Sequence, residues 1–263
     1  MINLQKNEQE LTNSVMSKIN LSKDKENLEK HVVSLSKCVV DLSKKAEVDL
    51  GATKARVVLV LDYSGSMSRL YKDGTVQETI NRLVPLGLTF DDNGSIDMFL
   101  FQTDFRKMED ITLDNYENYI HDVVDKSGYS MGGTRYAPVL EAILGNKEAK
   151  KGLFGKLLNK NNNNTLDTTN DPTFVLFITD GDSSDTSNTD KVIRESSKKE
   201  YKTFIQFIGI GSAGFKYLRD LDDLSGREVD NTGFSKMKDL ENVSDDELYT
   251  AILEQYVDWL KVM

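Results

Sequence analysis

Continuous runs of apolar residues alternate along the chain with amphipathic segments. The runs at residues 57–61 and 174–178 suit strands that are buried on both faces of a sheet. Segments such as 75–88 instead repeat their apolar positions every three or four residues, as one face of a helix does. The pattern predicts strands at 56–61, 95–101, 173–179 and 203–210, and helices at 75–88, 136–144, 191–200, 215–224 and 244–260. This alternation indicates an α/β fold with a doubly wound, mostly parallel sheet flanked by helices.

Weaker signals add detail to this outline. Residues 111–113 and 227–230 are expected to form short additional strands, and residues 114–125 a helix. Ser244, with Glu247 three residues later, has the spacing of a capping box. That spacing predicts where the last helix begins.

The first 50 residues differ from the rest, because they contain no glycine, proline or aromatic residue. Their leucines at seven-residue spacing predict a helix over residues 24–46. These leucines are Leu21, Leu28, Leu35 and Leu42. A recurring motif, an apolar residue followed by x-Leu-Ser-Lys, is also compatible with strands, but the regular spacing favours the helix.

The chain therefore divides into an N-terminal extension over residues 1–46, expected to be helical, and an α/β domain over residues 47–263. The simpler interpretation packs the helix on the domain, and the alternative is a coiled coil through which the chain forms oligomers. Residues 146–171 interrupt the α/β rhythm with lysines and a run of asparagines. We expect a flexible surface insert there, with a partner-docking segment as the alternative.

Composition and charge narrow the function. The 263 residues carry a formal net charge of −10, with a pI near 4.9. Binding to nucleic acid or to an anionic membrane needs clustered positive charge, so neither is expected as a partner. A single cysteine, Cys38, cannot form an internal disulfide. The N-terminus shows no secretory signal and no apolar run is long enough to cross a membrane, so we expect a cytoplasmic protein.

Oxygen-bearing side chains gather where predicted strands end. Asp62, Ser64 and Ser66 follow the first strand, Thr134 lies in a glycine-rich loop, and Asp180 follows the strand at 173–179. Carboxylates and hydroxyls are hard ligands that suit Mg²⁺, and also Mn²⁺ or Ca²⁺, better than Zn²⁺. Two carboxylates at neighbouring strand ends would repel each other without a cation between them. The pattern thus predicts a divalent metal site made of these side chains.

These residues, in this order, resemble the metal-ion-dependent adhesion site of a von Willebrand factor A domain. Longer stretches, including VVLVLDYSGSM and VLFITDGDSSD, resemble the A domains of the bacterial tellurite-resistance TerF-like group over about residues 47–263. The resemblance implies the Rossmann-like A-domain fold. It also implies that Ser64, Ser66 and Thr134 contact the ion directly, while Asp62 and Asp180 act through water or hydrogen bonds.

The resemblance further implies a function without catalysis. In such a module an Asp or Glu carboxylate of another protein completes the coordination of the ion. The expected function is metal-dependent protein binding in a tellurite-resistance or related stress-response system. Two alternatives stay open: a metal-dependent phosphoesterase that uses the same ion as a Lewis acid, and a scaffold that assembles through its N-terminal segment.

Other motifs carry less weight. The pattern G-x-G-x-x-G at residues 209–214 follows a late strand rather than the first, so a tight strand-to-helix turn is preferred over a dinucleotide site. A haloacid-dehalogenase-type phosphotransferase needs a second carboxylate where this chain has Ser64. The two histidines, His31 and His121, lie outside the expected strand-end loops, so a serine hydrolase lacks its base. Cys38 is expected to be a packed or exposed thiol.

Overall fold

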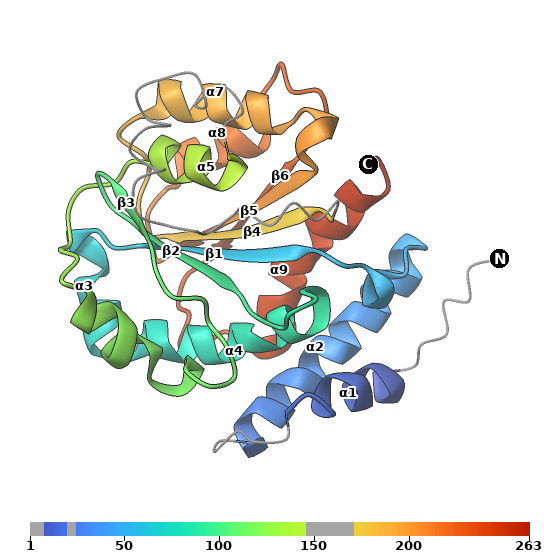
Figure 1. Cartoon of the computed structure of the whole chain (residues 1–263). Coiled ribbons are helices and arrows are strands. Elements are labelled where there is room, and N and C mark those ends of the chain that lie inside the picture. Colours follow the sequence, from blue (N-terminus) through green and yellow to red (C-terminus); the bar gives the residue numbers. More distant parts are fainter. Residues whose placement is uncertain (1–7, 20–24, 146–170) are drawn as a thin grey trace.

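A six-stranded sheet lies between two layers of helices (Figure 1). The computed structural model describes residues 8–19, 25–145 and 171–263. The strands lie in the order β3-β2-β1-β4-β5-β6, and all neighbours are parallel except β2 and β3. The predicted mostly parallel α/β fold is therefore confirmed. The strands are β1 (Arg56–Asp62), β2 (Asp97–Phe101), β3 (Phe105–Lys107), β4 (Thr173–Thr179), β5 (Thr203–Ile210) and β6 (Thr232–Met237).

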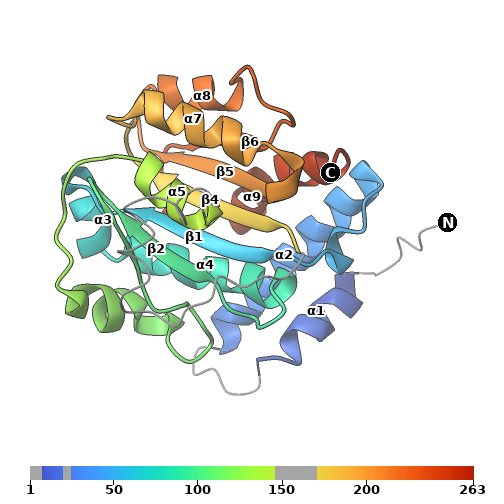
Figure 2. The ribbon, with the colours of Figure 1, turned by 45° about the horizontal axis from the view of Figure 1, so that its top comes forward.

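Helices cover both faces of the sheet (Figure 2). Apolar side chains form a core on each face. Successive residues of a strand point to opposite faces, so in β1 Leu59 and Leu61 join one core while Val58 and Val60 join the other. The first core is shared with α4 and α9, and the second with α5, α7 and α8. The helices of the domain are α3 (Ser68–Lys72), α4 (Thr75–Phe90), α5 (Ala137–Leu144), α7 (Thr186–Ser196), α8 (Lys216–Asp222) and α9 (Asp245–Leu260).

Two helices precede the sheet, α1 (Glu8–Met16) and α2 (Lys25–Ala46). The helix predicted over 24–46 is confirmed, and the strand alternative is wrong for this segment. Leu28 and Leu35 are each 1% exposed and belong to the core that α4 and α9 share. The seven-residue repeat therefore faces the chain's own core in this structure, as the simpler interpretation expected. Leu21 lies outside the described residues.

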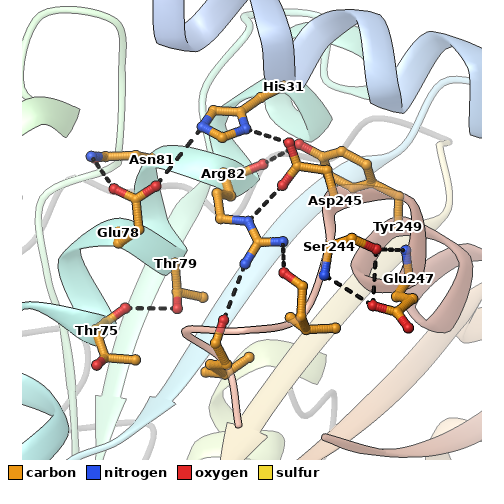
Figure 3. A network of polar contacts seen from close by, with 12 residues as sticks. His31, Thr75, Glu78, Thr79, Asn81, Arg82, Ser244, Asp245, Glu247 and Tyr249 are labelled. Carbon is orange, nitrogen blue, oxygen red and sulfur yellow. Dashed lines mark hydrogen bonds and ion pairs between the residues drawn. The ribbon is translucent and has the colours of Figure 1, made fainter.

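A buried polar network joins α2 to the domain (Figure 3). His31 Nδ1 lies 2.6 Å from one carboxylate oxygen of Asp245, and Arg82 Nε lies 2.6 Å from the other. Arg82, whose side chain is 7% exposed, also donates to the carbonyls of Leu240 and Val243. Burial alone would raise the pKa of Asp245, but the hydrogen bonds and charges of His31 and Arg82 outweigh it and lower the pKa. The start of α9 is thus anchored to both α2 and α4.

Two of the expected strands are wrong. Ile111 forms only an isolated antiparallel bridge with Ile96, and the strand near it is β3, six residues earlier. β3 is an edge strand with exposed Arg106 and Lys107, so it lacks the apolar alternation that marks a strand in sequence. Residues 227–230 form a turn in which Arg227 donates to nearby carbonyls, and the last strand, β6, begins after it.

Two helix predictions also need correction. Residues 114–125 contain short 3₁₀ and π turns instead of one α-helix. The helix expected over 191–200 begins earlier, at Thr186, and ends at Ser196.

The capping box at the start of α9 is confirmed, since Ser244 and Glu247 satisfy each other's backbone N–H groups. The insert expected near 146–171 lies almost wholly outside the described residues. No helix in the described ranges has both the length and the apolar character that a bilayer crossing demands.

Candidate metal centre

Two strand ends that carry predicted ligands lie side by side at the carboxyl edge of the sheet. Asp62 ends β1, and Asp180 follows directly after β4. The chain runs from β1 to β2 and β3 on one side before crossing to β4 on the other. The strand order therefore reverses between β1 and β4, and open α/β sheets bind ligands at such a point. The fold thus places both carboxylates where a ligand site is expected.

Asp62 is buried at the base of this edge, with 0% exposure. One carboxylate oxygen, Oδ1, accepts a hydrogen bond from the backbone N–H of Ser64 at 2.7 Å. The other, Oδ2, accepts one from the hydroxyl of Thr179 at 2.5 Å. With a donor on each oxygen, the orientation of the carboxylate is fixed from both sides.

Ser64, whose backbone N–H bonds to Asp62, and Ser66 connect Asp62 to Asp180. The two Oγ atoms are 3.0 Å apart, and the Ser66 hydroxyl donates to Asp180 Oδ1 at 2.8 Å. Ser64 is buried, whereas Ser66 is exposed and Asp180 half-buried. A line of oxygen atoms therefore runs from the interior to the surface, and it contains four of the five residues predicted from the sequence.

Thr134 is held beside these residues through its backbone. Ser64 and Gly132 form a parallel bridge, and the N–H of Gly65 donates to the Gly132 carbonyl at 3.2 Å. From the other side, the N–H and hydroxyl of Ser184 donate to the Thr134 carbonyl at 2.9 and 2.7 Å. The Thr134 hydroxyl has no hydrogen bond to any group that the structure describes, which leaves its oxygen available as a ligand.

Gly132 packs closely against neighbouring residues. A Cβ atom built there would collide with the side-chain amide of Gln102. The N–H of Gly132 also donates to the carbonyl of Tyr63 at 3.3 Å. A larger residue at position 132 would therefore require the Gln102 side chain to move.

The electrostatics of the site favour a cation. Burial is the main cause that raises the pKa of Asp62 to about 6; the nearby charge of Asp180 adds to the shift, and hydrogen bonds from Thr179 and Ser64 oppose it. Among the described residues, no Lys, Arg or His side chain forms an ion pair with Asp62 or Asp180. The negative charge of this pair therefore lacks a compensating protein charge.

The donor set fits a hard divalent ion. It consists of two carboxylates and three hydroxyls, which Mg²⁺ and Mn²⁺ accept and which Zn²⁺ disfavours. Within the described ranges, no cluster of three or more His, Cys, Asp or Glu side chains is arranged to hold a metal ion. Any metal at this edge would thus depend on the serine and threonine hydroxyls as well as the two aspartates.

Two residues that the sequence did not single out take part in the geometry. Thr179 orients Asp62, and its position directly before Asp180 could have pointed to it. Asp185 accepts a hydrogen bond from the backbone N–H of Tyr136, two residues after Thr134. Asp185 gave no signal in sequence, because an aspartate before a helix is an ordinary capping residue.

The loop at residues 209–214 is a strand-to-helix turn. The helix after it, α8, has seven residues, and the Phe215 ring packs so closely on Gly209 that a Cβ atom there would lie 3.0 Å from it. Lys236 and Arg219 donate to the carbonyls of Ala213 and Gly214. The N–H of Gly211 donates to the Met237 carbonyl at 2.8 Å, whereas a dinucleotide site presents such N–H groups to phosphates. The turn interpretation therefore describes this loop.

The described partners of the remaining reactive groups do not include the five candidate ligands. The imidazole of His121 is exposed and contacts the neighbouring Asp122, and His31 belongs to the network around Asp245. Cys38 is buried in α2, and burial raises the pKa of its thiol to about 11. It is therefore a packed, unreactive thiol.

Comparison with known proteins identifies the family. The chain belongs to the vWA-TerF-like family, described as the vWA found in the TerF C terminus, whose profile matches residues 54–263. The uncharacterized protein YcbR of Bacillus subtilis is 34% identical over 209 residues, which cover 79% of this chain and 78% of YcbR. The sequence-based resemblance to this group is thereby confirmed.

Two solved structures align with a large part of this chain at low identity. Proximal thread matrix protein 1 of the mussel byssus is 14% identical with a TM-score of 0.46, covering 78% of this chain and 48% of that one. The chain thus spans about half the length of that protein. The manganese-loaded TRAP protein of Plasmodium vivax is 15% identical with a TM-score of 0.46, covering 74% of this chain and 73% of that one.

Proposed function

We propose that the protein is a non-catalytic module that binds a partner protein through a divalent cation, with Mg²⁺ as the physiological ion. The ion would be held by Asp62, Ser64, Ser66, Thr134 and Asp180. The observation that carries the proposal is the line of oxygen atoms from Asp62 through both serines to Asp180, with no cationic side chain paired to either aspartate among the described residues. Such a set of oxygens is a ligand set for a hard cation.

The hydrogen bonds support a division of roles among the ligands. Both oxygens of Asp62 already accept donors, so Asp62 would act mainly by orienting Ser64 and supplying negative charge. Ser64, Ser66 and Thr134 would contact the ion through their hydroxyls. Asp180 would act through Ser66 or through water. The ion supplies a positive charge with open positions to which an anionic group can bind.

A partner carboxylate is the group that fits such an ion. Ser66 is exposed, so an Asp or Glu side chain of another protein can approach the site from solvent. The net charge of −10 would repel acidic partners that do not reach the ion, and this favours selectivity. The same charge makes nucleic acid and anionic membranes unfavourable partners. Membership in a family named for TerF supports a role in a cytoplasmic tellurite-resistance or related stress response.

The absence of catalysis is part of the proposal. In the described part of the chain, no His, Lys or Cys side chain hydrogen-bonds to the five ligands, so no general base of these types is in place. A screen of generic phosphoester substrates with Mn²⁺ is expected to show no turnover. Turnover that Asp180→Ala abolishes would instead establish the phosphoesterase alternative.

A pull-down tests the binding function. The full chain is immobilised, and cell extract is applied in Mg²⁺ or in EDTA, with Asp62→Ala and the exposed-site variant Ser66→Ala as comparisons. We expect proteins that the wild type retains in Mg²⁺, that EDTA releases and that neither variant retains. Retention of the same proteins by all three chains in both buffers would overturn the proposal.

A further inference from the structure

Asp185 stands at the start of α7 but does not cap that helix. An aspartate at this position normally accepts hydrogen bonds from the first backbone N–H groups of its own helix. Here its side chain makes no such bond. Its Oδ1 instead accepts the backbone N–H of Tyr136 at 3.0 Å, at the start of a different helix, α5. The carboxylate therefore joins two elements that are 49 residues apart in sequence.

Several groups hold this carboxylate in place. Its Oδ1 also accepts the hydroxyl of Ser183 at 2.5 Å and that of Thr189 at 3.1 Å. The other oxygen, Oδ2, faces Arg135 Nε at 3.4 Å. The side chain of Asp185 is only 7% exposed. The carboxylate is buried and contacts its own loop, α7 and residues 135–136. Its position is therefore fixed.

The segment that Asp185 holds is the one that carries Thr134. On one side, the β2–β3 turn holds this segment, since the Thr103 hydroxyl accepts the N–H of Gly133 and the Gln102 carbonyl accepts the N–H of Arg135. On the other side, Asp185 accepts the N–H of Tyr136, and its neighbour Ser184 donates to the Thr134 carbonyl. The segment with Thr134 is therefore hydrogen-bonded to two loops, and one of these loops also contains Asp180.

We propose that Asp185 is the positioning residue that fixes Thr134 relative to Asp180, and so sets the geometry of the metal ligands. The inference rests on the proposed metal-binding function. Asp185 does not itself touch the five ligand side chains; it acts through the backbone of residues 134–136. Residues that orient metal ligands in this way typically change metal affinity by about 10- to 100-fold when they are removed.

The carboxylate oxygen, rather than the charge, is the feature that the geometry uses. Asp185→Asn keeps an oxygen that can accept Tyr136 N–H, whereas Asp185→Ala removes every acceptor. We therefore expect the Asn variant to retain most of the positioning and the Ala variant to lose it. Asp182→Ala, an exposed aspartate in the same loop, is the matched control.

The first test needs no metal. Amide hydrogen exchange in the metal-free full chain should show faster exchange at Tyr136 in Asp185→Ala, and little change in Asp185→Asn or Asp182→Ala. Unchanged protection of Tyr136 in the Ala variant would overturn the positioning role whatever the metal does. If Asp185→Ala does not fold, Ser184→Ala takes its place. This variant removes the hydroxyl that donates to the Thr134 carbonyl, so faster exchange is expected at residues 134–136.

The second test asks whether Asp185 acts through Thr134. Mn²⁺ affinity is measured by calorimetry for the wild type, Asp185→Ala, Thr134→Ala and the double variant. We expect each single variant to bind about 10- to 100-fold more weakly, and the double variant to bind no more weakly than Thr134→Ala. Water-proton relaxivity of bound Mn²⁺ should rise equally in both single variants, because water replaces the lost hydroxyl.

The outcomes separate this inference from the function on which it rests. Additive losses in the double variant, or wild-type affinity in Asp185→Ala, would overturn the role of Asp185 while leaving the metal site intact. Failure of the wild-type chain to bind Mn²⁺ would overturn the metal site and the inference together.

Discussion

The hydroxyl of Ser66 donates a hydrogen bond to the carboxylate of Asp180 at 2.8 Å, across 114 residues of sequence. The contact exists because β1 and β4 are neighbouring parallel strands, with Leu61 paired to Ile178. Their following loops therefore start at the same height on the sheet. This one contact closes the line of oxygens on which the proposed metal site depends.

Magnesium is expected to stabilise the folded protein. A ligand that binds only the native state adds about 2.7 kcal/mol to the free energy of unfolding at a concentration 100 times its dissociation constant. Thermal unfolding of the wild type should thus shift upward with Mg²⁺, and the shift should shrink in Ser66→Ala. Ser130→Ala, an exposed serine in the glycine-rich loop, is the control that should keep the full shift. An equal shift in wild type and Ser66→Ala would remove Ser66 from the ligand set.

The hydroxyl of Thr179 is expected to matter more than its methyl group. Thr179→Val keeps the shape of the side chain but leaves buried Asp62 Oδ2 without its donor, at a cost of about 1–3 kcal/mol. Thr179→Ser keeps the donor and should cost less. Urea unfolding of the metal-free variants measures both. If Thr179→Val lowers the free energy of unfolding less than Thr179→Ser does, the hydrogen bond to Asp62 does not stabilise the fold.

Arg82 is expected to be the residue that fixes α9 to α4. Arg82→Ala would leave Asp245 and two carbonyls without their buried donor, so the free energy of unfolding should fall by about 3–5 kcal/mol. Lys45→Ala breaks the ion pair between Lys45 of α2 and Glu254, in which both side chains are largely exposed. The free energy of unfolding should then fall by less than about 1 kcal/mol. Chemical denaturation compares the two. Equal losses would mean that the network in Figure 3 stabilises no more than a surface ion pair.

Asp222 is expected to make the protein less stable as the pH rises from 4 to 6. Burial raises its pKa to about 6, against the partial effect of a hydrogen bond from Gln255. Between the unfolded and folded pKa values the folded state binds more protons, so the free energy of unfolding falls with rising pH, and the loss is completed as the pH passes the folded value of about 6. After discounting for partial exposure, the loss is about 1–2 kcal/mol.

The matched variant isolates this effect. Asp222→Asn should remove the loss, so its stability relative to wild type should increase between pH 4 and 7. Asp223→Asn removes an exposed neighbouring charge that contributes to the raised pKa of Asp222, so it should reduce the loss only slightly. Urea unfolding at several pH values gives these differences. A constant difference between Asp222→Asn and wild type would show that Asp222 titrates normally.

The sequence predicted the parts of this molecule that follow from regular patterns. The buried strands and the closeness of Asp62 and Asp180 could be predicted because apolar runs end at these aspartates, and parallel strands bring their carboxyl ends together. The helix over 25–46 followed from its leucine spacing. These features depend on residue type and position alone.

Other features depend on contacts that no local pattern shows. β3 is polar and lies at the sheet edge, so only its pairing with β2 makes it a strand. Thr179 has an ordinary strand composition, and its role comes from the approach of Asp62 across the sheet. Asp185 has the sequence of a helix cap, yet its carboxylate is used by another helix.

Calorimetric titration of the full chain with Mg²⁺ and Mn²⁺ shows whether Asp62 and Ser64 help to bind a divalent ion. The wild type should bind a single ion, and the double variant Asp62→Ala/Ser64→Ala should lose at least about tenfold in affinity. A variant that binds as tightly as the wild type, or a folded wild type that binds neither ion, would contradict the metal site proposed here.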